Sequence, residues 1–245
     1  MKRILLILFV VLSAQISQAQ MHQKGSSCMQ VGYGYPSAMQ LMGSFFKFAE
    51  SNITVEDDPA YQSSFSYKGF GPLHFRFDYM IGGRVGIGLS SNYELGNFKF
   101  SNTFTDFDEN IISSEAKFKL SSINVLARCN IHFIKEPTKI DIYYGLGVGY
   151  ARTRAKLEET LTGSNIDPLD QKEIDETNKE FNDFLNDVFK TVPVAFESVF
   201  GIKAPFGQNA GMYFEVGYSK AFCQLGFYVG LGGPKGYNRN KWQWF

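Results

Sequence analysis

The stretch LHFRFDY, residues 73–79, has an apolar or aromatic side chain at every odd position and a polar or charged one at every even position. Such alternation is typical of a β-strand with one apolar and one polar face. The pattern returns after Gly82 and Gly83, with Val85, Ile87 and Leu89 on the apolar face. These two segments are therefore predicted to form a tight antiparallel hairpin.

Six further segments alternate in the same way, which brings the number of predicted strands to eight. They cover residues 28–35, 123–133, 140–150, 194–203, 212–218 and 224–231. The connections after the second, fourth and sixth strands are short. Those after the first, third and fifth are long and polar, and cover residues 36–65, 97–114 and 156–190. Loops sorted in this way are typical of membrane barrels. The prediction is an all-β fold: an eight-stranded antiparallel up-and-down transmembrane β-barrel with long extracellular loops.

The polar face of these strands combines glycines with charged side chains. Alternation alone does not say which face points outward, because a soluble secreted barrel keeps its apolar face inside. Small and charged residues suit the crowded lumen of an eight-stranded barrel, where opposite charges can pair and offset their desolvation. The predicted lumenal ion network consists of Arg76, Asp78, Arg84, Arg128, Asp141, Glu197, Lys203 and Glu215. We therefore expect a plugged interior and a lipid-facing apolar wall.

The N-terminal residues indicate export. A basic pair precedes an apolar run over residues 4–12, and small residues follow near position 19. This order is typical of a secretory signal peptide, and the run is too short to cross a bilayer as a helix. We expect three parts: a cleaved signal peptide at 1–19, an outer-membrane β-barrel at 20–232 and an aromatic C-terminal tail at 233–245.

Charge and cysteine content exclude several classes of function. With Lys2 and Arg3 removed, 22 basic residues remain against 24 acidic ones, so a nucleic-acid partner is not expected. Cys28, Cys129 and Cys223 lack the close spacings of a metal or redox motif and are expected to be free thiols. No cofactor and no metal are predicted.

The last predicted strand carries a short motif. Its sequence QLGFYVGL, residues 224–231, resembles the assembly signal of outer-membrane barrels. The matching positions are the polar Gln224, Gly226, and the hydrophobic Val229 and Leu231. The resemblance implies that the barrel-assembly machinery reads this strand by strand pairing during insertion.

A wider resemblance lies in the first hairpin. Residues 70–79 and 84–93 resemble the small outer-membrane barrels common in Bacteroidetes, the PorT-like and OmpX-like proteins. This likeness covers the strands within residues 28–232 and not the loops. It implies a location in the bacterial outer membrane, contact with outer-membrane lipid and, for some members, a role in secretion or surface assembly. The tail departs from the pattern because it ends in WQWF, residues 242–245, which leaves open whether it adds a ninth strand.

The chain offers little for catalysis. Lipid-modifying enzymes on eight-stranded barrels need a histidine paired with a serine and an acid near the outer leaflet. His22 precedes the barrel, His132 lies beside a periplasmic turn and His74 points into the lumen, with no serine placed to complete a triad. We expect no enzyme. A lipid-modifying enzyme, a narrow channel and a soluble secreted binding barrel are the alternatives.

The third long connection contains a predicted helix. Apolar residues recur at helical spacing among many carboxylates: Ile174, Phe181, Phe184, Leu185, Val188 and Phe189. Packing over the barrel mouth is the favoured interpretation, and capture of a partner is the alternative. The carboxylates lack the residue order of a calcium loop.

The second long connection carries aromatic residues of the opposite parity to the lipid-facing ones. They are Phe98, Phe100, Phe104, Phe118 and Leu120. The third and fourth strands are therefore predicted to project beyond the membrane as a hairpin, whose aromatics contact a partner or the helix. The function expected is structural, or the binding of a surface or secretion-system protein.

Overall fold

The computed structural model describes residues 24–52, 61–105, 111–134, 140–163, 168–191, 193–206 and 209–232. The predicted signal peptide and the C-terminal tail lie outside these residues.

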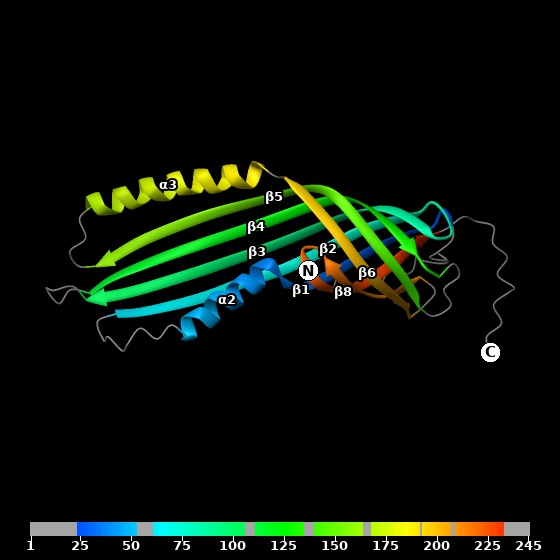
Figure 1. Ribbon diagram of the computed structural model, residues 1–245, viewed down its shortest axis with the longest axis horizontal. Helices are drawn as coiled ribbons and strands as arrows, with labels where there is room; N and C mark the ends of the chain where they lie inside the picture. The colour runs from blue at the N-terminus through cyan, green and yellow to red at the C-terminus, as the bar shows by residue number, and fades with distance from the viewer. Residues whose placement is uncertain are drawn as a thin grey trace, which may run out of the picture.

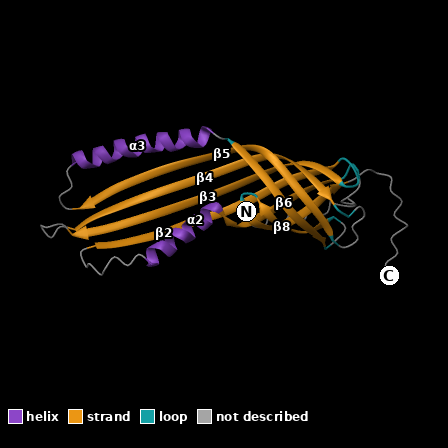
Figure 2. Ribbon diagram, in the orientation of Figure 1, coloured by secondary structure: helices purple, strands orange, loops and turns teal. Residues whose placement is uncertain are grey.

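The described chain forms eight strands and two helices (Figures 1 and 2). In order they are β1 (Ser27–Ser37), α2 (Ala38–Asn52), β2 (Tyr61–Met80), β3 (Val85–Thr105), β4 (Ile111–His132), β5 (Asp141–Gly163), α3 (Pro168–Thr191), β6 (Val194–Pro205), β7 (Ala210–Tyr218) and β8 (Ala221–Gly232). Each strand is antiparallel to the next, and β8 also pairs with β1, so the ring is closed. The predicted eight-stranded up-and-down barrel is confirmed, and its closure needs no strand from the tail.

Four neighbouring strands are twice as long as the others. β2 to β5 have 20 to 23 residues each, whereas β1, β6, β7 and β8 have 9 to 12. β1 pairs with β2 only as far as Leu73, and β6 pairs with β5 only as far as Tyr150. Past these residues β2 to β5 continue as an open four-stranded sheet, which we call the extension (Figure 1). It comprises residues 61–72, 94–105, 111–122 and 151–163.

The extension corrects part of the sequence prediction. The projecting hairpin of the third and fourth strands is confirmed, because β3 and β4 pair as far as Thr105 and Ile111. The neighbouring strands were wrongly predicted to end near the membrane. Residues 61–65 and 156–163, which fall in the predicted long connections, form sheet instead of loop because they can pair with the two sides of that hairpin.

The two faces of the sheet exchange polarity where the extension begins. In the barrel part of β3, Ile87 and Leu89 are exposed and the polar Asn92 is buried. Beyond it, Phe98 is buried on the inward side and Asn97 is exposed. The strand thus has its apolar face outward in the barrel and inward in the extension.

β2 reaches the same inverted arrangement through a bulge. Phe70 pairs with Leu95 and Leu73 with Tyr93, so Gly71 and Pro72 together oppose one residue of β3. The extra residue changes the parity of the strand, as β-bulges do. The bulge therefore lets Phe65 and Tyr67 of outer β2 face inward.

Both helices flank the extension. α2 follows β1 directly and packs mainly against β2, while α3 runs along β5 (Figure 1). Residues 38–52 were predicted as loop, which is wrong: Ser37 Oγ accepts a hydrogen bond from the Gln40 backbone at 3.1 Å, and Gln40 Oε1 accepts one from the Ser37 backbone at 2.9 Å. This reciprocal pair is a capping box, and it starts the helix.

The predicted helix in the third long connection is confirmed as α3. Its place differs from the expected one, because it lies beside β5 and not over the barrel mouth. Among the described helices, none combines the length and apolar character needed to span a bilayer.

Candidate functional site

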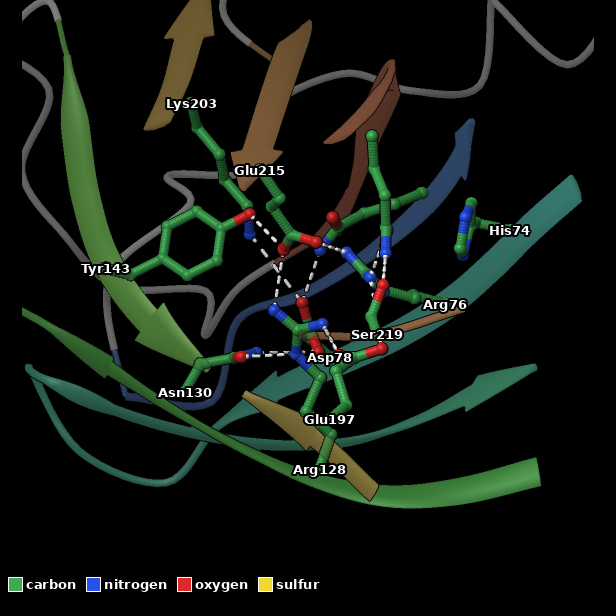
Figure 3. Close-up of polar contacts among 12 residues, drawn as sticks. His74, Arg76, Asp78, Arg128, Asn130, Tyr143, Glu197, Lys203, Glu215 and Ser219 are labelled. Carbon is green, nitrogen blue, oxygen red and sulfur yellow. Dashed lines mark hydrogen bonds and ion pairs between the residues drawn. The ribbon is translucent and has the colours of Figure 1, made fainter. Parts of the chain in front are cut away.

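The barrel lumen contains four charged side chains that pair two by two. Arg76 of β2 and Arg128 of β4 each contact both Glu197 of β6 and Glu215 of β7 (Figure 3). The Arg76 guanidinium lies 3.5 Å from Glu197, and that of Arg128 lies 2.6 Å from Glu215. All four side chains are buried. Four strands are thus joined through the centre of the barrel.

Neutral side chains complete this quartet. The Tyr143 hydroxyl donates to Glu215 at 2.6 Å, Arg76 donates to the Gln224 carbonyl at 2.6 Å, and Arg128 donates to Asn130 at 2.6 Å. Hydrogen bonds of this kind are needed because the attraction between buried charges offsets their desolvation cost only when the remaining donors and acceptors are also satisfied.

A second group of buried polar contacts lies nearer the short turns. The Lys203 ammonium is 3.6 Å from Asp78, which also accepts a hydrogen bond from Asn130 at 2.9 Å. His132 lies 2.8 Å from Asp141. The side chains of both pairs are buried. Asn130 therefore links this group to the quartet.

The structure places seven of the eight predicted network residues in the lumen. The prediction for Arg84 is wrong, since this residue is exposed in the turn between β2 and β3. β3 begins only at Val85, so the alternation that assigned Arg84 to the polar face does not extend to it.

Tyrosine rings fill the remaining space. Tyr143 and Tyr228 are among the largest fully buried side chains. A Cβ atom at Gly201 would overlap the ring of Tyr143, and one at Gly211 would overlap that of Tyr228. The lumenal glycines thus leave room for rings from neighbouring strands, which makes the interior a packed core.

The outer mouth of the barrel holds a polar cluster that the sequence did not indicate. The Lys220 ammonium, in the turn between β7 and β8, lies 3.9 Å from Glu94 and donates to Ser122 at 2.6 Å. Ser37, the cap of α2, donates its hydroxyl proton to Glu94. The cluster therefore connects the start of α2 with β3, β4 and the turn between β7 and β8.

The assembly motif lies on the strand that closes the ring. β8 pairs with both β7 and β1. Gln224 is buried in the lumen, Gly226 leaves space for the ring of Tyr213, and Leu231 is exposed on the outer wall. Val229 pairs with Met29 of β1.

The inner face of the extension carries an apolar cluster. Phe98 is 1% exposed, and its ring centre lies 4.9 Å from that of Tyr67. Phe46 of α2 lies 5.5 Å from Phe100, measured between ring centres. The other members are Met39, Met42, Phe65, Phe118, Leu120, Ala155 and Leu185. Four of the five aromatic and aliphatic residues predicted on the hairpin therefore lie in one cluster with residues of both helices, and Phe104 is exposed.

The free edge of β5 is covered by a ladder of asparagines from α3. Three asparagines at intervals of four residues bond to alternate backbone groups of the strand. The pairs are Asn186 with Ala155 (3.5 and 3.2 Å), Asn182 with Leu157 (2.6 and 2.8 Å) and Asn178 with Glu159 (3.3 Å). A side-chain amide offers both donors and an acceptor, so it can bond to a backbone N–H and C=O as a neighbouring strand would. The ladder therefore protects an edge that could otherwise pair with another chain.

Catalytic and metal sites were also sought in the described residues. His74 bonds to Asn92 and His132 to Asp141. No group of three or more potential metal ligands occurs there. The three cysteines are free thiols.

Comparison with known proteins gives limited information. No family model matches the chain, and no curated protein matches it. The outer membrane protein OprG from Pseudomonas aeruginosa is 12% identical, with a TM-score of 0.38, over 88% of this chain and 100% of that one. Two structures of Ail, the attachment invasion locus protein of Yersinia pestis, each cover 85% of this chain and 96% of Ail. One, bound to the heparin analogue sucrose octasulfate, is 12% identical with a TM-score of 0.28, and the other is 10% identical with a TM-score of 0.25. These values are too low to indicate a function.

Proposed function

We propose that the chain is a bacterial outer-membrane β-barrel protein with a plugged lumen, which has no enzymatic activity and serves as a structural or partner-binding element of the cell surface. The observation that carries the proposal is the inverted polarity of the barrel. Phe75, Val148 and Phe227 are about half exposed on its outer wall, whereas Arg76 and Glu215 are fully buried inside. A soluble barrel with an internal apolar face would have the opposite arrangement.

The height of the apolar wall supports a membrane location. On β5 the outward-facing apolar residues run from Ile142 to Tyr150. Nine residues at about 3.3 Å each, tilted by about 40°, rise roughly 23 Å, close to the ~25 Å apolar band of outer-membrane barrels. Closure of the ring by β8 and β1 leaves no free strand edge within this height, as a bilayer requires.

The lumen supports a role other than conduction. Water and solutes would have to pass the paired arginines and glutamates and the tyrosine rings, all of which are buried. The polar extension, on the side of the long connections, is then the part available to other molecules. The extension and the two helices that flank it form a surface outside the cell, suited to a surface or secretion-system partner. β8 is the strand offered to the barrel-assembly machinery during insertion.

The proposal is tested by expressing the full chain in a bacterium, isolating outer membranes and comparing gel mobility with and without boiling. We expect the protein in that membrane, with a shift on heating. A soluble chain without a shift contradicts the membrane location. The purified protein should add no steady conductance to a planar bilayer, and stepwise openings would contradict the plug. Mass spectra of lipid A with and without expression should agree, and a changed acyl pattern would contradict the absence of enzymatic activity.

A further inference from the structure

The outward face of the extension carries a cluster of cations. Outward-facing positions there follow the parity of Val125 on β4 and Tyr150 on β5. The positive residues at these positions, which we call the basic face, are Lys68, Lys99, Lys117, Lys119, Arg152, Arg154 and Lys156. Among the described residues, the same face holds two carboxylates, Glu115 and Glu158. Seven positive charges against two negative ones leave a net charge of +5 on this side of the sheet.

Ion pairs across the strands show that these side chains share one surface. Glu158 lies 2.7 Å from both Lys119 and Lys156, and Glu115 contacts both Lys99 and Lys117. Hydrogen bonds from its two lysines lower the pKa of the Glu158 carboxyl to about 2. At neutral pH each of these two carboxylates is therefore charged and is shared between two lysines.

Among the described residues, no ion pair joins a carboxylate of α3 to the basic face. Two carboxylates of this helix pair within it: Glu176 lies 3.9 Å from Lys172, and Asp187 lies 3.1 Å from Lys190. Arg152 and Arg154 are exposed and make no ion pair with a described carboxylate.

The two arginines lie just beyond the apolar wall. Arg152 pairs with Ile123 and follows Tyr150 by two residues, and Arg154 pairs with Ser121. At about 3.3 Å per residue they lie roughly 7 and 13 Å along the strand from the last apolar residue. A lipid headgroup layer occupies roughly 5–8 Å beyond the hydrocarbon on each side of a bilayer. Because the strands are tilted, both guanidinium groups fall near this layer.

We propose that the basic face binds the phosphate groups of anionic lipids in the outer leaflet of the membrane. Guanidinium groups bind phosphate oxygens with two parallel hydrogen bonds. We assign a lipid and not a soluble phosphate because the basic face continues directly into the apolar wall. A headgroup held by Arg152 and Arg154 would leave its acyl chains against Val125 and Tyr150. The site would then fix the orientation of the extension on the membrane surface.

This inference rests on the proposed membrane location, and one experiment separates the two. The full chain is purified and placed in nanodiscs of phosphatidylcholine containing a minor fraction of lipid A, and the lipids retained by the protein are measured by native mass spectrometry. The test variant is Arg152→Gln with Arg154→Gln. The control, Lys172→Gln with Lys190→Gln, removes two exposed charges from α3. The gel shift on heating is recorded for each.

We expect the wild type and the control to retain lipid A selectively over phosphatidylcholine. A basic side chain near an anionic surface changes binding by about fivefold, so the double arginine variant should lose roughly 25-fold of that selectivity. The single variant Arg154→Gln, with a smaller loss, replaces it if the double variant lacks the gel shift.

The other outcomes overturn the inference in distinguishable ways. If the wild type shows the gel shift but retains no lipid A, or if both double variants lose it equally, the lipid site is wrong and the barrel stands. Displacement by millimolar inorganic phosphate would assign the site to a soluble ligand. A wild type with no gel shift contradicts the membrane barrel and the lipid site together.

Discussion

Two glutamates of the chain make a matched pair for testing the role of the lumen. Glu215 lies between Arg76 and Arg128 inside the barrel, and Glu158 lies between two lysines on the extension. The side chain of the first is 0% exposed and that of the second 35%. Replacing either by glutamine removes one charge and keeps the shape.

Glu215→Gln should destabilise the barrel strongly. It leaves two buried guanidinium groups sharing the one remaining carboxylate, Glu197, and weakens the hydrogen bond from Tyr143. Breaking a buried ion pair by removing one partner costs about 3–5 kcal/mol. Glu158→Gln should cost about 0–1 kcal/mol, because water solvates the lysines it releases.

Urea unfolding in detergent, followed by the loss of the heat-shifted gel band, measures the difference. With a slope of about 3 kcal/mol per molar urea, the midpoint should fall by about 1–2 M for Glu215→Gln and by less than about 0.4 M for Glu158→Gln. Equal midpoints for the two variants would refute the view that the lumenal ion network holds the barrel together.

Three further predictions concern the extension. Asn182→Leu removes the two central hydrogen bonds of the ladder, worth about 1–3 kcal/mol together. Hydrogen exchange of the Leu157 amide should therefore be about 5- to 150-fold faster. The control variant Asp183→Leu, on the exposed side of the helix, should not change this rate. Unchanged exchange in the first variant would contradict the ladder. Phe98→Ala should cost the extension about 3–5 kcal/mol, seen as faster proteolysis of the extension with an intact gel shift, and equal proteolysis would count against a packed cluster. The Glu158 carboxyl has a pKa of about 2 when folded and about 4.5 when unfolded, so its stabilising effect is present above pH 4.5 and is lost as the pH falls towards 2; NMR titration near 4.5 would disprove this.

The barrel part of the fold was predictable because each strand there keeps one apolar and one polar face. The outer halves of β2 and β5 were not, since their apolar side chains face inward whereas those of the barrel face outward. In β5 the apolar residues change from even positions in the barrel to odd ones in the extension. In β2 the bulge at Gly71 and Pro72 also interrupts the alternation of inward and outward positions. Arg84 was misplaced for a related reason, because alternation gives the face of a residue but not the end of a strand.

The sequence carries two signals for the elements around the extension. Ser37 and Gln40 have the spacing of a capping box and could have predicted the start of α2. Asparagines at 178, 182 and 186 form a stripe of one residue type on one helix face, which is unusual for a solvated surface. Other features needed the fold itself, because the fit of Tyr143 against Gly201 joins residues from two strands whose register the sequence does not give.

The asparagine ladder joins two elements whose repeat distances differ slightly. Four residues of helix rise about 6.0 Å, whereas two residues of strand rise about 6.6–6.8 Å. Each successive asparagine is therefore displaced along the strand by a further ~0.7 Å relative to the backbone groups it binds. The bonds follow this rule: those of Asn182 at the centre are 2.6 and 2.8 Å, those of Asn186 are 3.5 and 3.2 Å, and that of Asn178 is 3.3 Å. A straight helix can match a strand edge over about three such steps. Four residues before Asn178 the helix has Ile174 instead of a fourth asparagine. There the longer side chain of Gln171 accepts a hydrogen bond from the Leu161 backbone at 3.4 Å. The length of edge that one helix can protect is thus set by the ratio of the two rises, and a longer edge would need a bent helix or a second one.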